Sequence, residues 1–142
     1  TAAANLFDAL FEQGRVAEAE RWLQIAEEEV EDDLPDMAAW VASSRALLMA
    51  AEGNRTGAMD IVRDPIPETR EPATRAWLHE ARGRALEILG EGEMALEHFA
   101  AAAEIYRRKE AYRSLANVEE RISRMLPADG RRLSPRERGA VG

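Results

Sequence analysis

The sequence predicts an all-α fold in which helix pairs stack as successive repeats, an architecture known as an α-solenoid. Alanine, leucine, glutamate and arginine dominate the 142 residues, and aromatic residues make up only 6%, which favours helix over sheet. Residues of the same kind also recur 37 positions apart. Pro35, Trp40, Arg45, Ala46, Gly53 and Ala58 are matched by Pro72, Trp77, Arg82, Gly83, Gly90 and Ala95. Self-similarity at this period is typical of stacked repeats, in which each unit covers its neighbour's apolar face.

A third, weaker copy of the repeat lies upstream, at an offset of 39 positions. Leu10, Gly14 and Ala19 correspond there to Met49, Gly53 and Ala58. Apolar residues at helical spacing predict seven helices, which make three pairs and one closing helix. Their expected ranges are 2–13, 16–31, 36–52, 56–63, 72–89, 93–108 and 110–125.

Glycines and prolines mark where these helices should end. Gly14, Gly53 and Gly90 each follow the first helix of a pair, the position at which glycine commonly terminates a helix. Prolines at positions 65, 67 and 72 predict that residues 63–71 form the longest loop, a hinge or an insertion. The last helix should cap the stack with a polar outer face. Its polar residues are Arg113, Asn117, Glu119, Glu120 and Arg124. We expect a repeat domain over residues 1–126 and an arginine-rich tail over 127–142.

Charge and composition exclude several classes of function. The net charge is −8, although the C-terminal end is basic. An acidic body repels phosphate, so we expect no nucleic-acid binding by this fragment itself. The chain contains no cysteine, which excludes disulfides and thiolate metal sites. It has no long apolar run and no secretory signal, so we expect a cytoplasmic protein without a membrane partner. A start at Thr1 suggests a piece of a longer protein.

Catalytic and metal-binding groups are not suggested by the sequence. No set of residues combines a nucleophile, a base and an oxyanion donor, so we expect no enzyme and no cofactor. His79 and His98 have no carboxylate at metal-ligand spacing, and a structural or surface role is expected for both.

The inter-helix turns resemble those of tetratricopeptide repeats (TPR). Residues 14–19 with Leu23 and Ala26, and residues 90–95 with Phe99 and Ala102, resemble the turn and second helix of such a repeat. Residues 53–58 with Val62 are similar, but Pro65 stands where the family has a small helical residue. Arg45 and Arg82 stand where the family has a large apolar residue, and the period exceeds the usual 34 residues. The resemblance implies three divergent TPR-like pairs.

This resemblance also implies a concave face that binds a peptide or protein segment. The residues expected to line or border it are Ala4, Asp8, Trp40, Ser43, Leu47, Trp77, Glu80, Arg84 and Glu87. The two tryptophans either stack on a ligand or, as we favour, pack at equivalent joints between helices. Arg45 and Arg82 either bind a carboxylate or phosphate, pair internally with glutamates such as Glu52 or Glu80, or are simply exposed to solvent.

The C-terminal end resembles a different family. Leu-Ser-Pro-Arg-Glu-Arg at residues 133–138 resembles the opening of a LuxR-type helix-turn-helix domain, although Gly139 and Gly142 depart from it. In large ATP-dependent regulators of the maltose-activator type, a helical-repeat region leads through an arginine-rich linker into such a domain. The resemblance implies the signal-receiving region of a cytoplasmic transcription regulator, whose partner is a protein or a small inducer. The alternative is a stand-alone adaptor or self-associating scaffold without a DNA-binding role.

Overall fold

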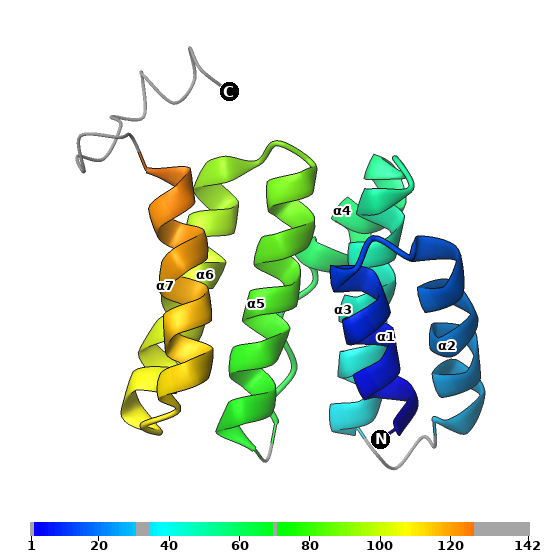
Figure 1. Cartoon of the computed structure of the whole chain (residues 1–142), viewed down its shortest axis with the longest axis horizontal. Coiled ribbons are helices and arrows are strands. Elements are labelled where there is room, and N and C mark those ends of the chain that lie inside the picture. The colour runs from blue at the N-terminus through cyan, green and yellow to red at the C-terminus, as the bar shows by residue number, and fades with distance from the viewer. Residues whose placement is uncertain (1, 31–34, 70, 127–142) are drawn as a thin grey trace.

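The computed structural model describes residues 2–30, 35–69 and 71–126, and these residues form seven α-helices (Figure 1). The helices are α1 (Ala2–Glu12), α2 (Val16–Glu29), α3 (Pro35–Ala51), α4 (Arg55–Arg63), α5 (Pro72–Ile88), α6 (Gly92–Arg108) and α7 (Tyr112–Met125). No strand occurs in the described residues, so the all-α prediction is confirmed. None of the described helices is both long and apolar enough to cross a membrane. The predicted tail, residues 127–142, lies outside the described residues.

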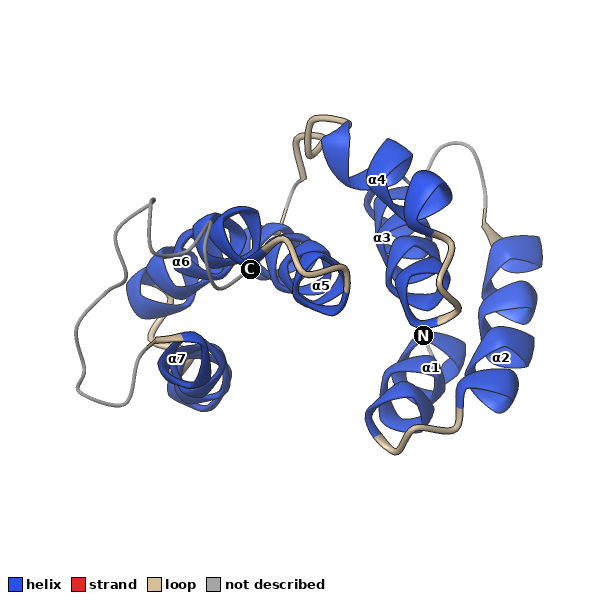
Figure 2. Cartoon of the chain, turned by 90° about the horizontal axis from the view of Figure 1, so that it is seen from above, coloured by secondary structure: helices blue, strands red, loops and turns tan. Residues whose placement is uncertain are grey.

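The helices pack largely in the order of the sequence. α1 packs on α2, α3 on α4 and α5 on α6, while α7 adds to α6. Contacts between α2 and α3 and between α3 and α5 connect these units. Seen from above, the row of helices is curved, with α1, α5 and α7 bordering its inner side (Figure 2).

Four turns between the helices share one backbone geometry. Gly14, Gly53 and Gly90 have φ angles of 76°, 82° and 81°, and Glu110 has a φ of 56°. In each turn the next residue's N–H donates to the carbonyl five residues earlier, which is the Schellman pattern that ends a helix. The bonds are Arg15 to Leu10 (2.9 Å), Asn54 to Met49 (2.8 Å), Glu91 to Leu86 (2.9 Å) and Ala111 to Tyr106 (2.9 Å). The predicted start of the last helix at Glu110 is therefore wrong: this residue ends the α6 turn, and α7 begins at Tyr112.

Two apolar clusters form the core and share α3. The first lies between α1, α2 and α3 and includes the fully buried Phe7 and Leu23. The second extends from α3 to α7 and includes Phe99. Leu48 belongs to the first cluster and Leu47 to the second, because adjacent positions on a helix point to different sides. α3 therefore links the two halves of the core.

Aromatic stacking joins three helices near the starts of α3 and α5. The rings of Trp40 and Trp77 are stacked, with centroids 5.4 Å apart and planes 28° from parallel. Phe7 of α1 meets Trp40 edge-on, at a centroid distance of 6.0 Å and an angle of 84°. Both arrangements are favourable for aromatic pairs. The two tryptophans therefore pack against each other at a single contact between α3 and α5, rather than at two equivalent joints.

Candidate functional site

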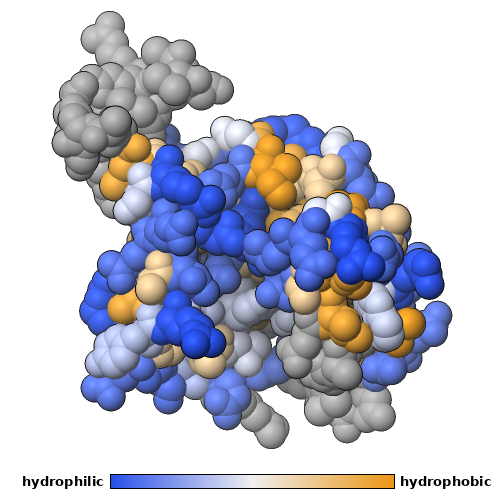
Figure 3. All heavy atoms as spheres, viewed as in Figure 1, coloured by the Kyte–Doolittle hydropathy of each residue, from blue (hydrophilic) through white to orange (hydrophobic). Residues whose placement is uncertain are grey.

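A polar pocket of about 350 Å³ lies between α1, α5 and α7. We call it the groove, and its lining residues are Asp8, Glu12, Glu80, Arg84, Asn117, Glu120, Arg121 and Arg124. The lining residues of α1 and of α5 are four positions apart, and those of α7 follow the pattern i, i+3, i+4 and i+7, spacings that place them on one side of each helix. The surface seen from the side of α1, α5 and α7 is predominantly hydrophilic (Figure 3). The groove therefore suits a polar or charged ligand better than an apolar one.

Arg84 of α5 forms the floor of the groove. Its side chain is only 5% exposed. It donates to Asp8 Oδ1 at 3.0 Å and forms a second ion pair with Glu12. Its guanidinium carbon also lies 5.5 Å from the centroid of the Phe11 ring, in cation–π contact. A buried guanidinium needs such partners, so these contacts fix α5 against α1.

Arg121 of α7 reaches across the groove to α1. Its Nη2 donates to Glu12 Oε1 at 2.9 Å, a bond between residues 109 positions apart. Glu12 therefore accepts from Arg84 and from Arg121 together. The α1 side of the groove carries the carboxylates of Asp8 and Glu12, and the α7 side carries two guanidinium groups and the carboxylate of Glu120. The α1 side is therefore acidic, and the α7 side is of mixed charge with a net positive balance.

Glu80 lies on the same face of α5 as Arg84 and is hydrogen-bonded to the Tyr106 hydroxyl. Burial raises the pKa of Glu80, and the charges of Arg84 and Arg121 partly oppose this rise. Burial and the neighbouring Glu80 carboxylate also raise the pKa of Tyr106. The phenol therefore keeps its proton and serves Glu80 as a neutral donor.

The structure brings three of the predicted concave-face residues together. Asp8, Glu80 and Arg84 all line the groove. Glu87 is partly buried on α5 and is not among the lining residues. The side chain of Ala4 is outside the described part of the chain.

Two other predicted residues need a correction. Ser43 and Leu47 of α3 have no exposed surface. Leu47 belongs to the apolar cluster that extends from α3 to α7. The prediction that they border an accessible face is wrong, because this side of α3 is covered by the neighbouring helices.

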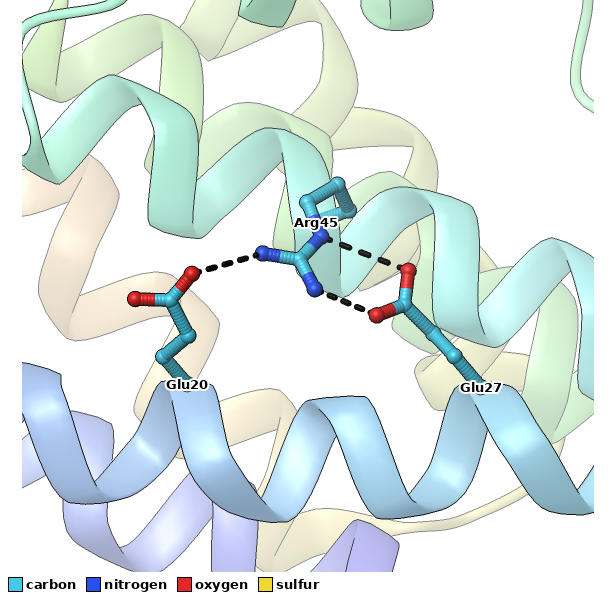
Figure 4. Close-up of polar contacts among 3 residues, drawn as sticks. All are labelled: Glu20, Glu27 and Arg45. Carbon is cyan, nitrogen blue, oxygen red and sulfur yellow. Dashed lines mark hydrogen bonds and ion pairs between the residues drawn. The ribbon is translucent and has the colours of Figure 1, made fainter.

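The two repeat-related arginines both make internal contacts. Arg45 of α3 pairs with Glu20 at 3.5 Å and with Glu27, both on α2 (Figure 4). Arg82 is 4% exposed and donates to the carbonyl of Val62 at 3.4 Å and to that of Asp64. Of the alternatives left open for Arg45 and Arg82, the structure shows internal contacts for both. Their partners are not the glutamates that the sequence suggested.

The two histidines form a pair between α5 and α6. Their Nδ1 atoms are 3.0 Å apart, so one ring donates to the other. Burial lowers the pKa of His79 to about 4, with further lowering by the charges of His98, Arg75 and Arg82. Burial and Arg82 also lower the pKa of His98. Among the described residues, no group of three or more histidine, aspartate or glutamate side chains is placed to hold a metal ion.

Sequence reasoning missed the contribution of α7 and of Glu12 to the groove. Asn117, Glu120 and Arg124 were expected on the polar outer face of the last helix, but they line the groove. Their spacing does show that they share one side of α7. Which side faces inward depends on how α7 rotates against α6, and composition alone does not contain that information.

No protein-family model, curated protein or solved structure matches this chain. The class of the protein is therefore defined by its own fold and groove: an all-α chain of packed helix pairs with a charged groove between α1, α5 and α7.

Proposed function

We propose that the chain is a protein-interaction module, which binds a peptide or protein segment in the groove. In this proposal the fold is an α-solenoid of three divergent TPR-like pairs, α1–α2, α3–α4 and α5–α6, with α7 as the closing helix. The observation that carries it is the position of the groove between three helices on the inner side of the curve. Stacked repeats commonly bind their partners on such concave surfaces.

The charges of the groove indicate the chemistry of the segment. Carboxylates on α1 face two guanidinium groups and the Glu120 carboxylate on α7, a side with a net positive balance, and the lining includes no large apolar side chain. A segment of mixed charge can therefore match both sides, with its basic groups toward α1 and its acidic groups toward α7. Charge complementarity of this kind sets the orientation of a partner and its rate of association more than its affinity.

Site-specific photocrosslinking in the source cells tests this proposal. A benzophenone amino acid would replace Asn117 or Glu120 in the groove, and, as matched controls, the exposed Asp60 of α4 or Glu97 of α6. We expect the two groove positions to give the same adduct and the two control positions to give none. Adducts from the controls alone, or none from the groove, would refute the groove as the binding site.

A second candidate function is the repeat region of a cytoplasmic LuxR-type transcription regulator. The observation that favours it is the Leu-Ser-Pro-Arg-Glu-Arg run at residues 133–138, which follows the last helix. In this candidate the groove receives a protein or a small inducer, and DNA is bound only by a domain beyond Gly142. An immunoblot of source cells should then detect a polypeptide much larger than 15.8 kDa. A band at that size would favour a stand-alone adaptor.

A further inference from the structure

We propose that the Glu12–Arg121 ion pair is a clasp that holds the groove narrow, and that a bound segment must open it. That a segment binds in the groove is taken from the proposed function, whereas the ion pair itself is a property of the free chain. Arg121 donates to Glu12 at 2.9 Å, and this bond connects the first described helix to the last.

The clasp connects two helices whose main packing partners are different. α1 packs on α2, and α7 packs on α6. α7 buries Leu115 and Val118 in the cluster that extends from α3 to α7, whereas Phe7 of α1 lies in the other cluster. Phe11 of α1 also packs against the cluster that holds Leu115 and Val118. The Arg121–Glu12 bond therefore adds a polar link between α1 and α7 to this apolar contact. Glu12 also binds Arg84, so the clasp is tied to the floor of the groove.

The exposure of the pair suits a contact that opens. The Glu12 side chain is 49% exposed and that of Arg121 is 20% exposed. Water and salt compete for the half-exposed Glu12 carboxylate, which weakens its pair with the less exposed Arg121. Arg84, at 5% exposure, is held by Asp8 as well and stays in place when Arg121 leaves Glu12. Opening therefore releases one side of the groove while the buried Arg84 keeps Asp8 as its partner.

The clasp also limits which segments can enter. A basic group of the segment takes the place of Arg121 on Glu12, and an acidic group takes the place of Glu12 on Arg121. This exchange replaces one ion pair within the chain by two ion pairs to the segment. A purely basic segment leaves Arg121, which is only 20% exposed, without its carboxylate, whereas Glu12 keeps Arg84 when an acidic segment takes Arg121. The occupant that pairs both charges is a segment with neighbouring acidic and basic side chains.

Electron-spin distance measurements on the free chain test the clasp. The chain has no cysteine, so Ala9→Cys on α1 and Ser123→Cys on α7 give two labels at exposed positions. Adding Arg121→Gln should lengthen the mean distance between the labels by about 2 Å, the size of ordinary helix shifts, and broaden its distribution. The matched control is Glu104→Gln, which removes two exposed ion pairs within α6 and should leave the distance unchanged.

Salt provides a second test that needs no substitution at the clasp. At about 1 M salt the labelled parent should shift toward the distance of the Arg121→Gln chain, because exposed ion pairs are screened. The Arg121→Gln chain itself should not respond. Identical distances in both chains at low and high salt would overturn the clasp. No partner is added, so this outcome is independent of the crosslinking experiment on the proposed function.

Discussion

Gly83 lies where α5 approaches the ring of Phe99 on α6, and this contact leaves no room for a side chain. An added Cβ would lie 2.7 Å from ring atom Cε1 of Phe99, which is itself fully buried. We expect Gly83→Ala to lower the free energy of unfolding by about 1–3 kcal/mol, because overpacking outweighs the better helix propensity of alanine. Urea unfolding of the parent and the variant measures this difference in the free energy of unfolding.

Gly92 provides the control for this substitution. The nearest side-chain atom to an added Cβ at Gly92 is Met125 Cε, at 3.9 Å, an ordinary contact distance. Gly92→Ala should therefore leave stability unchanged or raise it slightly. Equal stability of the two variants would show that the α5–α6 interface adapts to a larger residue.

Among the four turns of shared geometry, the one at Glu110 places a residue with a side chain in the left-handed conformation, which is unfavourable in free energy. Glu110 adopts a positive φ of 56°, where the other three turns have glycine. A side chain in this left-handed region costs about 1 kcal/mol, which glycine avoids. Glu110→Gly should therefore raise the midpoint of thermal unfolding, and Gly53→Ala should lower it. A lower midpoint for Glu110→Gly would mean that the glutamate side chain stabilises the turn by more than the backbone cost.

Individual helices were predictable because their signals are local. Apolar residues at helical spacing and the glycine at each turn predict where α1 to α6 begin and end. Each predicted bound lies within two residues of the observed one. The Glu110 turn was missed because glutamate gives no sign of a left-handed backbone. Contacts between helices, such as Arg45 with Glu27, were not predictable in detail. They depend on the rotation of each helix about its axis, which the spacing of charged residues does not determine.

The pairing of His79 on α5 with His98 on α6 predicts an acid-sensitive helix interface. The pKa of His79 is lowered from 6.5 to about 4 in the folded chain. Between these values the unfolded chain binds a proton that the folded chain does not, so stability falls as pH decreases from about 6.5 toward 4. Above pH 6.5 this contribution is fully present.

Unfolding at a series of pH values, with His79→Asn as the comparison, measures this contribution. The raised pKa of Glu80 acts in the opposite direction, so only the difference between parent and variant isolates the histidine. We expect the parent to lose more stability than His79→Asn on acidification through this range. Parallel pH profiles would contradict the role assigned to the pair.

At the scale of the whole molecule, the groove results from the curvature of the row of helices. Asp8, Arg84 and Arg121 are far apart in the sequence and meet because α1, α5 and α7 share the inner side. Three residues that the resemblance to helical repeats placed on a concave face, Asp8, Glu80 and Arg84, line the groove. The resemblance failed for Ser43 and Leu47, which neighbouring helices cover completely. The degree of curvature depends on small rotations between successive helices, and sequence spacing does not fix these.

Hydrogen-exchange mass spectrometry tests the central claim, that the groove is where a partner binds. The measurement compares the free chain with the chain bound to the partner identified by crosslinking. We predict slower exchange in peptides from α1, α5 and α7, and unchanged exchange in α2 and α4, which do not line the groove. Protection confined to α2 and α4 would place the partner on the outer surface and contradict the account.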